Sequence, residues 1–73
     1  MITNIGIAAG EIWQYLDQNG EINLNELLNR IEKDRDVVIM SLGWLAREGH
    51  IVLEQIESDY RIRLREKQES IKP

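Results

Sequence analysis

The spacing of apolar residues divides this chain into three segments of helical period followed by two of strand period. The first helical segment covers about residues 5–18, where apolar residues recur every three or four positions: Ile5, Ala8, Ala9, Ile12 and Leu16. Thr3 or Asn4 can cap its start, and Gly20 suits its end because glycine tolerates positive φ. We therefore predict a first helix over residues 5–18, with Trp13 widening its apolar stripe.

A second, shorter helix is predicted directly after a brief extended segment, Glu21–Asn23. Asn23 followed three residues later by Glu26 resembles a capping box, with Asn in place of Ser or Thr. The apolar residues that follow keep a helical spacing: Leu24, Leu27, Leu28 and Ile31. Only residues 32–34 separate this helix from the next, and so tight a turn between two helices predicts a helix-turn-helix.

The third helical segment, residues 34–49, is apolar on more than one side. Asp34 can cap its start and Gly49 suits its exit. Its central apolar stripe, at helical spacing, is formed by Val38, Leu42 and Leu45. Further apolar residues flank the stripe on both sides: Val37, Met40 and Trp44 on one side, Ile39 and Ala46 on the other. A helix that is apolar nearly all round is usually buried on more than one side. In a chain of 73 residues, the second buried side predicts a partner.

After Gly49 the period becomes alternating, which predicts a hairpin. Residues 60–65 alternate strictly, with Tyr60, Ile62 and Leu64 on one face and Arg61, Arg63 and Arg65 on the other. Ser58-Asp59 offers turn chemistry. Leu53 must share a face with Ile62 and Leu64. Loops of two or four residues both satisfy this and place Glu54 opposite Arg63 or Arg61, and the sequence does not decide between them.

The predicted order α-β-α-α-β-β is that of a winged helix-turn-helix, a three-helix core with a small sheet and a two-stranded wing. Two blocks of residues add a more specific signal: Ile5-Gly6, Ala9-Gly10 and Ile12-Trp13 in the first helix, and Gly43-Trp44-Leu45-Ala46-Arg47-Glu48 in the third. Through these blocks the chain, up to Leu64, resembles a small stand-alone winged helix-turn-helix family of unknown function from bacteria and archaea. This resemblance implies the fold and a homodimer, but no known ligand or DNA site.

Length and composition predict one domain over residues 1–65 and a flexible charged tail over residues 66–73. A domain of this size hides only about 60% of its unfolded surface, so self-association is a natural source of stability. There is no cysteine, no signal-peptide pattern and no apolar stretch near the ~20 residues that span a bilayer. We expect a cytoplasmic protein without a membrane partner.

Charge and side-chain chemistry argue against catalysis and against general attraction to nucleic acid. The net charge is −4, and all of it lies in residues 1–34, which hold six acids against two bases. An acidic balance opposes phosphate binding. The chain has one histidine, His50, on a face predicted to be exposed, and no metal-ligand spacing. We therefore expect no enzyme activity, no cofactor, no metal and no small-molecule substrate.

DNA binding is nevertheless the usual role of this fold, and it makes a chemical demand on the third helix. Its N-terminal half should offer polar or basic side chains to base edges, yet only Arg35 suits that role. A basic stripe on the wing, followed by Lys67, is the better candidate for phosphate contact: Arg61, Arg63 and Arg65. The alternative is a solvent face paired with Glu54 and Glu57.

The remaining candidate is a protein interface, for which the predicted residues are Trp13, Ile39, Met40 and Trp44. The alternative is that one or both tryptophans lie in the core of the monomer. The leading hypothesis is a self-associating module of transcriptional-regulator type that binds DNA weakly through the third helix and the wing. The alternative hypothesis is a protein-interaction or dimerisation module that has lost nucleic-acid binding.

Overall fold

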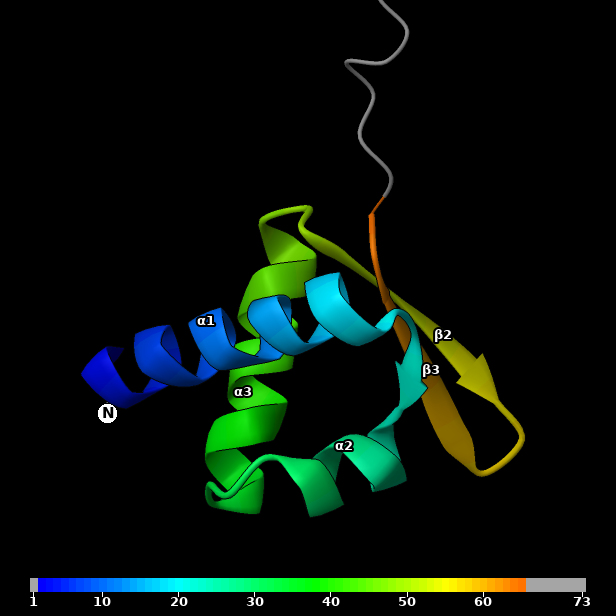
Figure 1. Cartoon of the computed structure of the whole chain (residues 1–73), viewed down its shortest axis with the longest axis horizontal. Helices are drawn as coiled ribbons and strands as arrows, with labels where there is room; N and C mark the ends of the chain where they lie inside the picture. Colours follow the sequence, from blue (N-terminus) through cyan, green and yellow to red (C-terminus); the bar gives the residue numbers. More distant parts are fainter. Residues whose placement is uncertain (1, 66–73) are drawn as a thin grey trace, which may run out of the picture.

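The computed structural model describes residues 2–65, which form three helices and a three-stranded antiparallel sheet (Figure 1). The elements are α1 (Ile2–Asn19), β1 (Ile22–Asn23), α2 (Leu24–Arg30), α3 (Arg35–Arg47), β2 (Ile51–Ile56) and β3 (Asp59–Leu64). The strands lie in the order β1-β3-β2. The predicted α-β-α-α-β-β order is confirmed; the predicted tail, residues 66–73, lies outside the described residues.

Helix α1 begins at Ile2, three residues earlier than predicted, so Thr3 and Asn4 lie inside it and do not cap it. No proline or glycine stands at residues 2–4 to stop the helix, and a cap residue marks only where a helix can begin. Its end is as predicted. Gly20 has φ +84°, and its N–H donates to the carbonyl of Leu16 at 2.8 Å. None of the described helices is both long and apolar enough to cross a membrane.

The caps of the two later helices are only partly those predicted. Asn23 accepts a hydrogen bond from the N–H of Glu26 at 3.0 Å, but the carboxylate of Glu26 pairs with Arg30 instead of completing the capping box. Asp34 stands at the N-cap of α3, yet its side chain makes no cap hydrogen bond. Gly49, at φ +83°, follows the helix as predicted.

The core lies where α1 crosses α3 and both meet the inner face of the sheet (Figure 1). Buried apolar residues from every element line it: Ala9, Ile12, Leu16, Ile22, Leu27, Ile31, Val38, Leu42, Leu45, Ile51 and Ile62. Among the described residues, Ser41 is a buried polar residue beside this core. Its hydroxyl donates to the carbonyl of Val37 at 2.7 Å and reaches that of Ile5 at 3.2 Å, which joins α3 to α1.

The wing hairpin has the shorter of the two loops that alternation allowed. Leu53 pairs with Ile62, and Glu54 faces Arg61. The two turn residues are Glu57 and Ser58, one position earlier than Ser58-Asp59, because Asp59 already pairs in β3. Glu57 adopts φ +44°, a left-handed conformation unusual for a residue with a Cβ.

Candidate interaction surfaces

The exposed side of α3 is divided into two flanks that face different parts of the molecule. Ile39 and Gly43 face the wing, whereas Trp44 faces α1. Met40 lies one turn before Trp44, and the two are 45% and 48% exposed. The alternative that Trp44 belongs to the core is therefore wrong. The structure also places Ile39 in a different groove from Trp13 and Trp44.

The flank that faces α1 opens into a groove of about 280 Å³, which we call the tryptophan groove. It is lined by α1, by α3 and by the residues that follow α3: Gly6, Ala9, Gly10, Trp13, Trp44, Leu45 and His50. Trp13 is 39% exposed. The centroids of the Trp44 and His50 rings lie 6.2 Å apart. Two half-exposed tryptophans in one groove form a large apolar surface that water covers in the monomer.

Gly6 and Gly10 stand one turn apart in α1 and line this groove, although nothing in the fold requires a glycine there. A Cβ built at either position meets no atom within 4 Å. Glycine inside a helix destabilises it by roughly 0.5–1 kcal/mol relative to alanine. The two glycines thus weaken α1 without any packing gain among the described residues. The sequence alone could not identify these two glycines as surface residues, because their exposure becomes known only from the structure.

The flank that faces the wing borders a second groove of about 410 Å³, the wing groove. Its lining is mainly apolar and comes from α2, α3 and both hairpin strands: Leu24, Arg35, Ile39, Leu42, Gly43, Leu53, Tyr60 and Ile62. Leu53 and Tyr60 are 40% and 41% exposed, and neither was among the predicted interface residues. They lie on the inner face of the hairpin, where they border the groove without being covered.

The predicted DNA-binding arginines do not form one surface. Arg35 lines the wing groove beside inner-face residues of the hairpin, whereas Arg61, Arg63 and Arg65 alternate onto its outer face. Arg61 sits on the central strand and forms ion pairs with Glu21 at 3.2 Å and Glu54 at 3.3 Å. Within residues 2–65 no ion pair forms at Arg63 or Arg65. The predicted pairing with Glu54 is confirmed for Arg61.

A family model described as a winged helix-turn-helix domain (DUF2582) matches residues 1–64. The chain belongs to this family. No curated protein and no solved structure matches the chain. The family assignment agrees with the fold and with the resemblance drawn from the sequence, and it assigns no ligand to either groove.

In this winged helix-turn-helix domain α3 occupies the position of the recognition helix, the second helix of the motif. Base readout there relies on amide, basic or hydroxyl groups near the helix N-terminus. The exposed residues of this half of α3 are Arg35, Asp36, Ile39 and Met40. One cation, one anion and two apolar side chains make a poor base-reading set.

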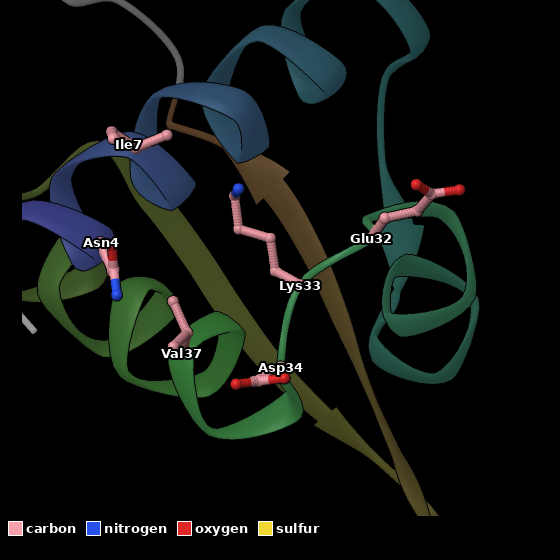
Figure 2. A pocket seen from close by; sticks show the side chains of 6 residues that line it. All are labelled: Asn4, Ile7, Glu32, Lys33, Asp34 and Val37. Atoms are coloured by element: carbon pink, nitrogen blue, oxygen red, sulfur yellow. The ribbon is translucent and has the colours of Figure 1, made fainter.

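A third hollow lies between α1 and the turn that joins α2 to α3 (Figure 2). It measures about 280 Å³, and Lys33 extends from the turn toward α1. The ammonium of Lys33 lies 3.6 Å from the carboxylate of Glu11, so the contact holds the turn against α1. We read the hollow as structural.

Proposed function

We propose that this winged helix-turn-helix domain is a protein-interaction module that self-associates through the tryptophan groove, and that the exposed side of α3 contacts protein rather than base edges. The observation that carries the proposal is the pair of exposed glycines in α1. Gly6 and Gly10 leave a bare strip of helix beside Trp13 and Trp44. A helix surface that carries no side chain at these two positions lets another backbone or a large aromatic ring approach closely.

The same surface can serve both members of a symmetric pair. A two-fold interface brings identical patches together, so it needs a projection and a matching depression on one surface. The tryptophan groove provides both, because the rings project beside the bare strip at Gly6 and Gly10. In a two-fold dimer, the tryptophans of each copy lie over the glycines of the other. Burial of these rings supplies the favourable free energy.

Sedimentation equilibrium of the full chain tests this proposal. The parent protein should be a dimer that dissociates on dilution. Trp44→Ala should raise the dissociation constant by about tenfold or more, which corresponds to about 1.4 kcal/mol. Met40→Glu, beside Trp44 on the same flank of α3, should act in the same direction.

Tyr60→Ala is the matched control, because Tyr60 is a similarly exposed aromatic residue in the wing groove. It should leave the dissociation constant unchanged. A parent protein that stays monomeric at the highest soluble concentration contradicts the proposal. An equal loss of affinity in Trp44→Ala and Tyr60→Ala contradicts the placement of the interface.

A second candidate function, DNA binding through the outer face of the wing, is favoured by one observation. Arg63 and Arg65 are exposed on that face, and residues 2–65 offer neither an ion-pair partner. Two adjacent guanidinium groups can follow a phosphate backbone without reading sequence. Against this stand the net charge of −4 and the neutralisation of Arg61 by two glutamates.

Duplex binding at low and intermediate salt separates the two functions. If the wing binds phosphates, the double variant Arg63→Ala/Arg65→Ala should reduce the salt slope by about 1.8, or about 0.9 for each lost contact. Arg61→Ala is the control, because its charge is already paired. The absence of duplex binding at low salt removes the DNA function and leaves the protein-interaction function in place.

A further inference from the structure

The outer edge of the sheet is open. The strand order β1-β3-β2 makes β2 an edge strand, and Figure 1 shows no described segment on its far side. The N–H of Arg65 donates to the carbonyl of His50 at 3.0 Å, which fixes the hydrogen-bonding phase of the hairpin. In an antiparallel pair, alternate residues bond to the partner strand and the others point away from it. The backbone groups of Ile51, Leu53 and Gln55 therefore point outward from β2.

This edge lacks the features that normally prevent strand pairing. Edge strands are usually short, bulged or broken by proline and lysine. Strand β2 has six residues, and its register with β3 is continuous from Ile51 to Ile56. Its sequence, IVLEQI, contains one charged residue, Glu54, whose carboxylate is held by Arg61. The strand can accept another extended chain along three outward residues.

The open edge and the wing groove adjoin at Leu53. Its backbone points outward along the edge, while its side chain lines the groove with Ile39 and Gly43. A strand added beside β2 places every second side chain on the inner face, next to Leu53. Gly43 leaves room there, because a Cβ at this position meets no atom within 4 Å. Backbone pairing and an apolar groove together are the elements of strand addition.

We propose that the β2 edge and the wing groove bind an extended segment of a different protein, with apolar side chains at alternate positions and a carboxylate that meets Arg35. Charge indicates this occupant: Arg35 is the one charged residue of the groove lining and forms no ion pair within residues 2–65. The choice of a different protein rests on the proposed function. A second copy paired along this edge as well would build an assembly larger than the proposed dimer, either a closed tetramer or an open polymer.

Two synthetic peptides test the proposal on isotope-labelled full-length protein. The first is Val-Thr-Val-Thr-Val-Thr-Glu with both ends blocked, and the second carries Lys in place of the Glu. Saturation with the Glu peptide should slow hydrogen exchange of the Ile51, Leu53 and Gln55 amides by about tenfold or more. The Glu peptide should bind about fivefold more tightly than the Lys peptide at low salt, and Arg35→Gln should abolish that preference.

Two pairs of variants separate edge pairing from side-chain effects. Gln55→Pro removes an outward N–H but no hairpin hydrogen bond, and Gln55→Ala shortens the same side chain while keeping the N–H. The proline variant should bind the Glu peptide at least about fivefold more weakly than the alanine variant. Gly43→Leu, which fills the groove, should weaken binding similarly, whereas Gly43→Ala should change it less. If Gln55→Pro does not fold, the Gly43 pair and Arg35→Gln still decide the question.

Several outcomes overturn the proposal. One is unchanged exchange at the three outward amides when the Glu peptide is added. Another is hydrogen exchange at those amides that becomes slower as the protein concentration is raised without peptide, because this would mean that a second copy of the chain occupies the edge. Equal binding of the two peptides removes the role of Arg35. Sedimentation of the parent protein and Trp44→Ala reports separately on the tryptophan groove, so failure of that interface is distinguishable from failure of this one.

Discussion

Replacing Gly10 by alanine should change the stability of the monomer and the affinity of the dimer in opposite directions. In the monomer the added Cβ meets no atom within 4 Å, and α1 gains roughly 0.5–1 kcal/mol of helix propensity. About 1 kcal/mol raises the melting temperature of a domain this small by about 4–8 °C. In the dimer the same methyl group fills space used by the other copy. Overpacking costs typically about 1–3 kcal/mol at each site, and a two-fold interface contains the site twice. The dissociation constant should therefore rise by at least about thirtyfold.

Thermal unfolding followed by circular dichroism, at a concentration where the parent is monomeric, measures the first effect. Sedimentation equilibrium at higher concentration measures the second. Gly43→Ala is the matched control, because Gly43 is also an exposed helical glycine with open space but lines the wing groove. It should give a similar gain in melting temperature and no loss of dimer. If Gly10→Ala stabilises the monomer and leaves the dissociation constant unchanged, the interface does not lie over Gly10 and the reasoning is refuted.

The remaining predictions concern stability and are read by the melting temperature of dilute protein. Ser41→Ala should lower the free energy of unfolding by about 1 kcal/mol, because a buried hydroxyl bonded to the carbonyls of Val37 and Ile5 is lost; an unchanged melting temperature would mean that this contact does not hold α1 to α3. Gly49→Ala should destabilise by about 1–2 kcal/mol, because φ +83° is unfavourable for a residue with a Cβ. Glu57→Gly should instead stabilise the protein, by up to about 1 kcal/mol, because Glu57 already occupies φ +44°. Shifts of the same sign at Gly49 and Glu57 would contradict the backbone argument.

Most of the fold could be predicted because the local sequence patterns of the helices and strands are unambiguous. The apolar spacing in each helix, Gly20 and Gly49 at helix ends, and strict alternation at residues 60–65 all lead to the observed elements. Two boundaries were wrong for a shared reason. Polar residues permit a cap or a turn without requiring one, so α1 extends to Ile2 and the hairpin turn lies at residues 57–58.

The surfaces were harder to predict because exposure depends on the packing of distant segments. The periodicity of α3 predicted more apolar side chains than one core can bury. In the structure, Met40 and Trp44 are accordingly about half exposed. The sequence could not show that Ile39 faces the wing while Trp44 faces α1, since that division follows from where α1 crosses α3. Leu53, placed on the core face by alternation, is 40% exposed because it borders the open wing groove.

Titration of isotope-labelled protein with a random-sequence DNA duplex at low salt tests most directly whether the exposed side of α3 contacts protein rather than base edges. The backbone amides of Arg35, Ile39 and Gly43 report on the N-terminal half and the wing-facing flank of α3. We predict that these three amides do not shift at any duplex concentration, even if weak phosphate contact moves signals at Arg63. Saturable shifts at Arg35, Ile39 and Gly43 on addition of duplex would contradict the account.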